Sequence, residues 1–263
     1  MSSLSITLIQ SQLHWEDKQA NLAMFEEKIN TIKEHTEIVI LPEMFSTGFS
    51  MKTEELSETM DGPTVEWMKR TAIAKRIILT GSVIIHEKEN YFNRLVWMLP
   101  NGTFGYYDKR HLFAYGEEDR HYNPGNKRLI ASIKGWKINL QVCYDLRFPV
   151  WARQQAQEQP EYDLLIYVAN WPERRNHAWK TLLQARAIEN QCYVAGLNRV
   201  GNDGNNIYHS GDSTVINALG EQLYYKAHEE DIFTITLQKE TLEDIRTRFP
   251  FWKDADAFTI INE

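Results

Sequence analysis

The chain has 263 residues, a length compatible with one α/β domain that buries a substantial core. Its formal net charge is −7 with both signs interspersed, which argues against general binding to nucleic acid or to an anionic membrane surface. No segment approaches the ~18 consecutive apolar residues that a membrane span requires, and we expect no secretion signal.

Cysteine and histidine usage narrows the chemistry further. The two cysteines are too few for a disulfide framework, so we expect a reducing, cytoplasmic location. The eight histidines are scattered, and neither a CxxC nor an HExxH motif occurs. The sequence therefore predicts no metal site.

The pattern of apolar residues predicts strands and helices that alternate along the chain. Predicted strands occupy residues 5–10, 38–41, 77–85, 91–99, 104–107, 129–133, 136–142, 163–169, 192–197, 213–217, 221–226 and 231–237. Predicted helices occupy residues 17–34, the segment after the turn at 61–64, and residues 150–159, 176–190 and 240–248. The Gly- and Asn-rich segment 198–206 is predicted to be a loop, and Cys192 is assigned to a core strand.

Two of the predicted strands indicate how the sheets are covered. Residues 38–41 and 164–169 are apolar almost throughout, which is typical of strands buried on both faces. The short connection at 100–103 requires the strands that flank it to be antiparallel. An α/β fold in which two mixed sheets lie face to face, each covered by helices, would explain these runs, but the spacing alone does not establish that arrangement. With no repeat or linker in the sequence, one domain spanning residues 1–263 is the simplest organisation.

Cys143 stands where the apolar run 138–142 gives way to polar and charged residues. A thiol at the end of a buried strand, facing a charged loop, is well placed to act as a nucleophile. A free cysteine is more commonly a small buried apolar residue. This stretch alone does not decide between the two interpretations.

Glu43 follows the buried strand 38–41 directly, after Pro42, which fixes φ and ends the strand ladder. A single loop glutamate is usually solvated. Here the neighbouring residues Met44, Phe45 and Phe49 indicate a partly buried pocket. A carboxylate in such a pocket can act as a base near neutral pH.

Lys109 belongs to a short charged run, residues 107–113, flanked by aromatic and apolar residues. An exposed basic loop is the ordinary interpretation of such a run. Because its flanks are apolar, we expect one of its cations to point inward. A buried lysine near a thiol lowers the thiol pKa from ~8.5, and it can also hydrogen-bond to an oxyanion.

A carboxylate, an ammonium and a thiol together supply a base, an electrophilic support and a nucleophile for amide hydrolysis. The residues Glu43, Lys109 and Cys143 each follow a strand-like stretch. A cysteine–histidine pair using His111 or His177 is the rival arrangement. The residue types alone leave both arrangements open.

The chain resembles the nitrilase, or carbon–nitrogen hydrolase, superfamily along nearly its whole length. The resemblance is carried by five segments in this order, at residues 41–45, 107–113, 142–149, 170–172 and 184–191. It implies an α-β-β-α sandwich that often dimerises, and a Glu–Lys–Cys triad at Glu43, Lys109 and Cys143. It also implies an oxyanion site formed by the lysine and the backbone N–H of Tyr144.

A second, supporting glutamate of the family matches Glu118, and the neighbouring Glu117 is the weaker match. The resemblance implies that this carboxylate orients the lysine or the substrate amide. It implies no metal and no organic cofactor. We expect a homodimer or a higher homo-oligomer, with the aromatic tail at about 249–263 as a candidate dimer arm.

Within the superfamily the chain is most similar to the bacterial omega-amidase branch, through segments 45–49, 110–113 and 170–172. That similarity implies small substrates such as 2-oxoglutaramate and 2-oxosuccinamate. Their carboxylate needs a fixed cation, preferably an arginine.

Arg174 and Arg175 are the candidates for this cation, and Arg147 is a weaker one that could instead pair with Asp145. Trp171 and Phe45 are predicted either to line the pocket or to pack in the core.

The predicted activity is release of ammonia from an amide through a cysteine thioester. The same residues could instead act on an aliphatic amide, an N-carbamoyl amine or a nitrile, because a fold does not fix a substrate. A non-catalytic scaffold is the alternative from another class, and none of the three triad positions is lost.

Overall fold

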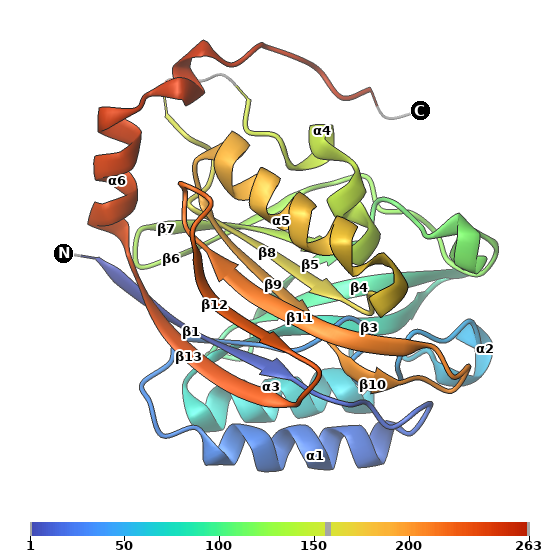
Figure 1. Cartoon of the computed structure of the whole chain (residues 1–263). Helices are drawn as coiled ribbons and strands as arrows, with labels where there is room; N and C mark the ends of the chain where they lie inside the picture. The colour runs from blue at the N-terminus through green and yellow to red at the C-terminus, as the bar shows by residue number, and fades with distance from the viewer. Residues whose placement is uncertain (1, 156–158, 262–263) are drawn as a thin grey trace.

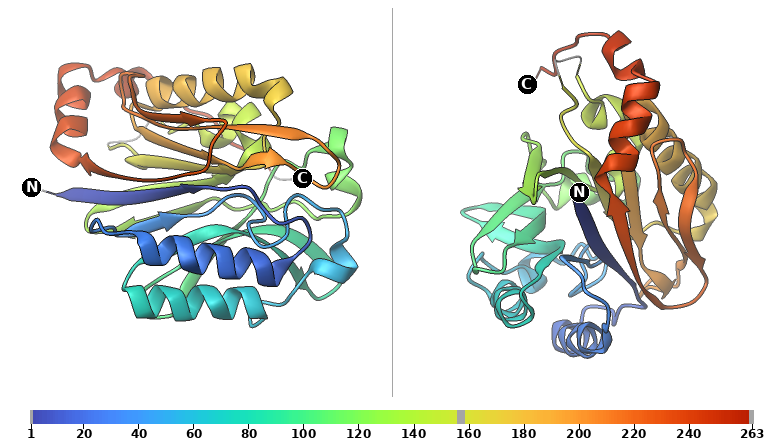
Figure 2. Two further views of the ribbon diagram at one scale, coloured as in Figure 1. Left: turned by 60° about the horizontal axis from the view of Figure 1, so that its bottom comes forward. Right: turned by 90° about the vertical axis from the view of Figure 1, so that its left-hand side faces the viewer.

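The computed structural model describes residues 2–155 and 159–261. Two mixed β-sheets pack face to face, and helices cover their outer faces (Figures 1 and 2). This is the expected four-layer α-β-β-α architecture. Within the described ranges, no helix is both long and apolar enough to cross a bilayer.

The first sheet has six strands in the order β13-β1-β2-β3-β4-β5. In that order the strands are Asp231–Gln238, Ser3–Gln10, Ile38–Ile40, Ile78–Glu87, Asn90–Met98 and Phe104–Asp108. The last strand of the chain pairs antiparallel with the first. The C-terminal part of the chain therefore returns to the sheet in which the chain begins.

The second sheet has seven strands, with the order β10-β11-β9-β8-β7-β6 and with β12 paired to β11. These strands are Val200–Asn202, Tyr208–Ile216, Tyr193–Asn198, Leu164–Ala169, Trp136–Val142, Leu129–Ile133 and Gln222–Ala227. Its central strands β7, β8 and β9 run parallel. Their carboxyl ends therefore meet at one edge of the sheet, where the segments after β7 and β8 come together.

Six α-helices complete the described layers: α1 (Lys18–Thr31), α2 (Thr53–Leu56), α3 (Pro63–Lys75), α4 (Pro149–Ala152), α5 (Asn176–Asn190) and α6 (Lys239–Arg248). Helices α1 and α3 cover the first sheet, and α5 covers the second (Figure 1). Asp17 caps α1 by accepting a hydrogen bond from the Ala20 N–H, and Pro63 opens α3 at a position where no N–H is needed.

Strand β2 shows why the apolar runs are continuous. Ile38 and Ile40 belong to the core between the two sheets, whereas Val39 belongs to the core between the first sheet and its helices. Because alternate side chains point to opposite faces of a strand, both faces of β2 are buried. Gly81 on β3 permits a close approach to the segment after β2, because a Cβ there would lie 2.9 Å from Leu41 Cβ.

Three local predictions need correction. The helix expected at 150–159 ends at Ala152, and residues 156–158 lie outside the described residues. Gln154 leaves the helix because its backbone N–H donates to Asn190 Oδ1 and its side chain donates to Tyr162 O. Cys192 is fully buried but precedes β9. The segment predicted as a loop at 198–206 contains the short strand β10, which pairs with β11.

Candidate active site

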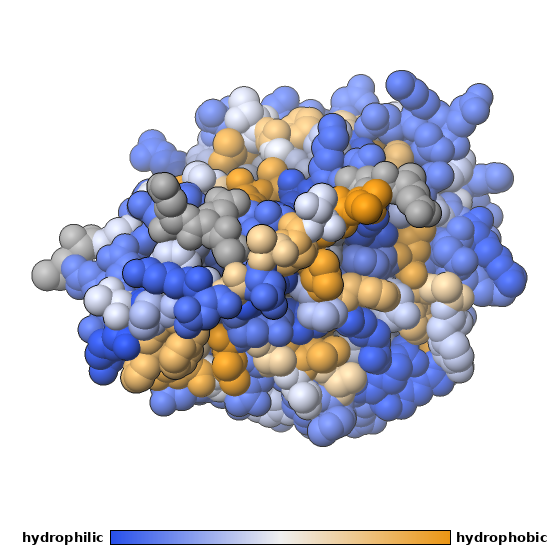
Figure 3. All heavy atoms as spheres, turned by 90° about the horizontal axis from the view of Figure 1, so that it is seen from above, coloured by the Kyte–Doolittle hydropathy of each residue, from blue (hydrophilic) through white to orange (hydrophobic). Residues whose placement is uncertain are grey.

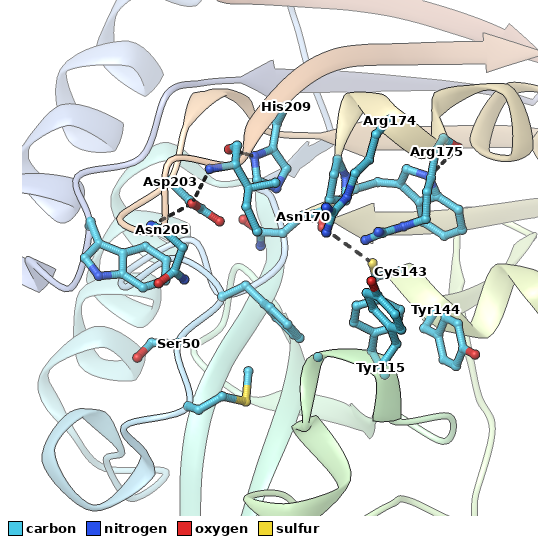
Figure 4. A pocket seen from close by; sticks show the side chains of 18 of the residues that line it. Ser50, Tyr115, Cys143, Tyr144, Asn170, Arg174, Arg175, Asp203, Asn205 and His209 are labelled. Atoms are coloured by element: carbon cyan, nitrogen blue, oxygen red, sulfur yellow. Dashed lines mark hydrogen bonds between the residues drawn. The ribbon is translucent and has the colours of Figure 1, made fainter.

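Cys143 is the first residue of a 3-10 turn, Cys143–Arg147, that follows β7 directly. Its φ of +45° is in the left-handed region, which a non-glycine residue adopts only when its surroundings enforce it. Its side chain lies at a cavity, with Sγ 4.0 Å from the carbonyl oxygen of Asn170 (Figure 4). The sharp turn therefore presents the thiol at the edge of the second sheet and does not seal it inside the core.

Glu43 is fully buried just beyond β2. Its Oε1 accepts a hydrogen bond from Asn93 Nδ2 at 2.8 Å, and its Oε2 accepts one from the backbone N–H of Asn170 at 2.7 Å. Asn170 also donates from its side chain to the Glu43 carbonyl oxygen. These contacts fix the carboxylate against the segment that follows β8, on the second sheet.

Lys109 follows β5 and is buried. Its Nζ donates to Glu43 Oε1 at 2.9 Å and to Glu118 Oε2 at 2.8 Å. Glu118 is fully buried and also accepts a hydrogen bond from the Phe113 N–H at 2.6 Å. Asn93 Nδ2 contacts Glu118 Oε1 at 3.2 Å, so one amide group joins the two carboxylates. The ammonium is therefore held from two sides.

Burial and the charges of this cluster together raise the pKa values of both Lys109 and Glu118, but for different reasons. Burial alone would lower the pKa of Lys109, but the carboxylates of Glu118 and Glu43 outweigh burial and hold it well above its ordinary value. Burial raises the pKa of Glu118, which Lys109 lowers only in part. The lysine is consequently a permanent cation in this site.

The pKa of Cys143 moves opposite to the sequence-based expectation. Burial raises it well above the ordinary value and the negative charge of Glu43 raises it further, whereas Lys109 lowers it only in part. The resting side chain is therefore a neutral thiol. Its hydrogen-bond contact with the Glu43 carboxylate provides a direct acceptor for its proton.

A cavity of about 410 Å³ opens above Cys143. Figure 4 shows it running from Cys143, Arg174 and Arg175 on one side to Ser50, Asp203 and Asn205 on the other. Aromatic side chains form much of its wall, namely Trp15, Phe49, Phe113, Tyr115, Tyr144 and Trp171. This size and this mixture of apolar walls with a few polar groups are typical of a small-molecule site.

Three arginines line the same cavity: Arg147, Arg174 and Arg175. The guanidinium of Arg175 lies 5.0 Å from the Phe113 ring centroid, and that of Arg147 lies 4.9 Å from the Trp171 ring centroid. Across residues 2–155 and 159–261, none of the three pairs with a carboxylate. Burial lowers the pKa of Arg175, and the nearby charges of Arg174 and Arg147 lower it further. The guanidinium groups of Arg147 and Arg175 therefore lie over aromatic faces, and their N–H groups are available to an anion.

The remaining predicted site residues fall into two groups. Trp171 lines the cavity, with its Nε1 donating to the Arg175 carbonyl oxygen at 2.8 Å. Phe45 does not line it, because its ring packs against Phe25 and Trp67 in the core between the first sheet and its helices. Its prediction as a pocket residue is thus corrected in favour of core packing. Glu117 is directed to the surface, where it pairs with Arg120.

The two histidines considered as partners of the thiol lie elsewhere. His111 Nδ1 bonds to Asp145 Oδ1 at 2.8 Å, and its ring stacks on Phe148. His177 is an exposed residue of α5. Asp145 bonds to His111, so the ion pair considered between Asp145 and Arg147 does not form. Among the described residues, no cluster of His, Cys, Asp or Glu is arranged to hold a metal.

Sequence reasoning missed four contributors to the site. Asn93 joins Glu43 to Glu118, Asn170 anchors Glu43, and Asp145 connects the segments that carry Lys109 and Cys143. His209 lines the cavity as a buried side chain whose pKa burial lowers to about 4, so that it is uncharged at neutral pH. The sequence signals for Asn170 and Asp145 were their position after a predicted buried strand and their place in the family segments 170–172 and 142–149.

The sandwich fold and the buried cluster of Glu43, Lys109 and Cys143 together define a class of protein, and similarity to known proteins identifies that class. The chain belongs to the carbon–nitrogen hydrolase family, whose sequence profile matches residues 5–247.

Among individual relatives, it is 44% identical to Omega-amidase YafV of Escherichia coli (strain K12), over 99% of this chain and 100% of that protein. It is 29% identical to 2-oxoglutaramate amidase of Bacillus subtilis (strain 168), over 95% and 96% of the two chains. A similar solved structure is XC1258 from Xanthomonas campestris, a CN-hydrolase superfamily protein with an arsenic adduct in its active site. It has a TM-score of 0.96 and 44% identity, over 99% of this chain and 100% of that one.

Proposed function

We propose that this carbon–nitrogen hydrolase is an omega-amidase. It would hydrolyse the terminal amide of small 2-oxo dicarboxylic acid monoamides, such as 2-oxoglutaramate and 2-oxosuccinamate, to the acid and ammonia. The observation that carries the proposal is the position of Cys143, with Glu43 and Lys109 beneath it, in a cavity lined by three arginines that pair with no carboxylate in the part of the chain that the structure describes. The names of the similar omega-amidase and 2-oxoglutaramate amidase support the same substrate class.

In the first half of the proposed reaction, Cys143 Sγ attacks the amide carbon while its proton moves to Glu43. Because the resting thiol is neutral, attack and proton transfer are coupled. Lys109 Nζ and the backbone N–H of Tyr144 hold the developing oxyanion. When the C–N bond breaks, Glu43 returns the proton to the leaving nitrogen, which departs as ammonia and leaves a thioester.

In the second half, Glu43 takes a proton from water, and the hydroxide equivalent attacks the thioester carbon. The C–S bond breaks, the acid product forms, and the proton returns to the sulfur. Each step uses a permanent cation beside a carboxylate that alternates between two protonation states. Glu118 supports the proposal because it holds Lys109 without a described contact to the sulfur, so that Glu43 is left to exchange the proton.

The arginines account for the substrate class. A 2-oxo acid monoamide carries its carboxylate at the end away from the amide, so the bound molecule would point an anion at the guanidinium groups. Of the three, Arg175 is the best placed to bind this anion. It is half-buried, and it lies close enough to Cys143 and Arg147 for their charges to shift its pKa. An α-amino group at the same end would be repelled by these three cations.

Ammonia release from a panel of substrates tests the proposal. The panel contains 2-oxoglutaramate, 2-oxosuccinamate, glutamine, an uncharged aliphatic amide, an N-carbamoyl amine and a simple nitrile. We expect kcat/KM for the two 2-oxo acids to exceed that for glutamine by at least about 100-fold, because a misplaced charge in a desolvated pocket costs several kcal/mol. Equal or faster turnover of the nitrile, the carbamoyl compound or the neutral amide would contradict the substrate assignment.

Two broader properties belong to the same proposal. Both cysteines are free thiols, which supports a reducing compartment such as the cytoplasm. A homodimer is supported by exposed apolar side chains near the C-terminal segment, including Val150, Phe249 and Phe251. Figure 3 views this face and shows apolar residues interspersed with polar ones. Light scattering on the full chain would test this association directly.

A further inference from the structure

Asp145 is a buried carboxylate that the proposed reaction does not use. It lies two residues after Cys143, in the 3-10 turn that presents the thiol, and its side chain is fully buried. Burying a carboxylate without a compensating partner is unfavourable, so its hydrogen bonds show which parts of the molecule it serves.

Those hydrogen bonds reach both sides of Lys109. Asp145 Oδ2 accepts from the hydroxyl of Tyr107 at 2.8 Å, two residues before the lysine. Asp145 Oδ1 accepts from the backbone N–H of His111 at 2.9 Å and from its Nδ1 at 2.8 Å, two residues after the lysine. One carboxylate therefore holds the chain on either side of the cation.

The same carboxylate also fixes the nucleophile turn. Its Oδ2 accepts from the backbone N–H of Val142 at 3.0 Å, the residue immediately before Cys143. This local contact closes the turn in which Cys143 adopts its positive φ and which also carries the Tyr144 N–H. Asp145 thus contacts the segment of the lysine and the segment of the cysteine at once.

A second layer of contacts keeps these partners in place. The Tyr107 hydroxyl accepts from Trp151 Nε1 at 2.9 Å and from the Arg110 N–H at 3.1 Å. Burial and the charge of Asp145 raise the pKa of Tyr107 well above its ordinary value, so it remains a donor. The His111 ring stacks on Phe148, with centroids 3.9 Å apart. The geometry around Asp145 is therefore determined from several directions.

The contacts of Asp145 are important for the geometry of the site because Lys109 and Cys143 come from different sheets. Lys109 follows a strand of the first sheet and Cys143 follows a strand of the second. The backbone bridge between the sheets is made by Gln12 and Val200, neither of which belongs to the segments of these two residues. The relative placement of Lys109 and Cys143 at the site consequently depends on side-chain packing and on polar contacts between the sheets. Asp145 supplies such contacts within two residues of both reacting groups.

We propose that Asp145 is a positioning residue that sets the distance between Lys109 and the Cys143–Tyr144 turn. The proposal rests on the proposed roles of these residues in amide hydrolysis. An error of 1 Å in such a placement can cost about 100-fold in rate, because the oxyanion donors must meet an atom that exists only in the transition state. Arg174 and Arg175 lie in a separate turn, Glu173–Arg175, outside the turn that Asp145 fixes, so we expect substrate binding through them to be retained without Asp145.

Asp145→Asn tests the proposal. An amide has one oxygen where the carboxylate has two, so its NH₂ group must face either the His111 donors or the Val142 N–H. We expect kcat for the substrate of the wild-type enzyme to fall about 100-fold while KM changes less than about 3-fold. A loss expressed only in KM, or a loss of less than 3-fold in kcat, would overturn the proposal.

A matched control separates positioning from stability. Asp163 is also buried and also accepts a backbone N–H, that of Lys137, and it pairs with Lys239 and Arg246 away from the cavity. Asp163→Asn is expected to lower the melting temperature and leave kcat unchanged. If the two variants lose kcat in equal proportion to their loss of stability, Asp145 is merely structural.

Further variants keep the test valid if Asp145→Asn fails to fold. Tyr107→Phe removes one donor, and His111→Leu removes another. His111→Asn can retain a side-chain donor near the position of Nδ1. We expect His111→Asn to restore most of the kcat that His111→Leu loses, a rescue that loss of packing alone would not produce.

Alkylation of Cys143 by iodoacetamide provides a readout that needs no substrate. Lys109 favours the anionic sulfur, so displacing the lysine in Asp145→Asn should slow alkylation at neutral pH several-fold. Failure of the omega-amidase assignment would leave this rate difference intact. An unchanged alkylation rate in a folded Asp145→Asn variant would contradict positioning, whatever the substrate is.

Discussion

Charged side chains lie at the floor of the cavity, around Lys109 and Cys143, and on the arginine-lined wall, around Arg147 and Arg175. The two sets of charges are balanced in different ways. On the floor, Lys109 is fully enclosed and bonded to the carboxylates of Glu43 and Glu118. On the wall, Arg147 and Arg175 lie over aromatic rings, and neither bonds to a described carboxylate. The charged groups of the floor, Glu43, Lys109 and Glu118, belong to segments that follow strands of the first sheet, whereas Arg147 and Arg175 belong to segments that follow strands of the second.

The difference follows from the cost of burying charge. A fully buried ammonium must be paired, because an isolated charge in a medium of low dielectric constant is strongly destabilising. A half-exposed guanidinium retains part of its hydration and tolerates the lack of a partner. The paired floor is therefore ready for a reaction that moves one proton, and the unpaired wall is ready for an anion to bind.

The largest effect is expected on the floor. Cys143→Ala should reduce ammonia release by at least about 10⁴-fold, because it removes the atom that attacks the amide. Cys192→Ala is the matched control, since Cys192 is the other buried free thiol and lies outside the cavity. We expect it to retain kcat within about 2-fold while losing about 1 kcal/mol of stability. A Cys143→Ala variant that keeps more than about 1% of the wild-type turnover would contradict the assignment of the nucleophile.

A smaller and selective effect is expected on the wall. Arg175→Gln should raise KM for the 2-oxo acid substrates by about 10–100-fold, because a hydrogen bond to a charged group contributes about 1.5–3 kcal/mol. Turnover of an uncharged amide should change little. Steady-state kinetics on both substrates measure the difference.

Arg128→Gln serves as the control for this variant. Arg128 is an arginine already paired with Glu161, away from the arginine-lined cavity. Its replacement should leave KM unchanged for both substrates. If Arg175→Gln raises KM by the same factor for the charged and the neutral amide, the arginine-lined wall does not select anions.

The smallest effect is expected in the free energy of unfolding, through His209 at the far side of the cavity. Burial lowers the pKa of His209 from 6.5 to about 4, so between these values the unfolded chain binds a proton that the folded chain excludes. Stability should therefore fall as the pH drops from about 6.5 towards about 4. This group alone should contribute a loss of about 2 kcal/mol between about pH 7.5 and about pH 5.

Urea unfolding of the wild type and of His209→Gln at these two pH values measures that contribution. The variant should lose less stability on acidification, because glutamine has no proton to gain. Parallel pH dependences of the two proteins would contradict a buried neutral histidine.

The sequence by itself determined the layers and three of the reacting groups. Continuous apolar runs such as 38–41 are typical of strands covered on both faces, and together with the family resemblance they predicted two sheets with outer helices. Glu43, Lys109 and Cys143 each stand just after a strand-like run, so their positions were readable from local pattern together with the order of the family motifs. Local pattern succeeds here because burial periodicity is a property of one element at a time.

The tertiary structure decided which side chains meet. It brings Glu118 and not Glu117 to Lys109, places Phe45 in a core beside Trp67, and joins Asp145 to the segment of Lys109. It also makes the Cys143 thiol neutral, because burial and Glu43 outweigh Lys109. These outcomes depend on distances between groups 9 to 100 residues apart in the chain, which lie on different elements of the fold, so the periodicity of no single element contains them.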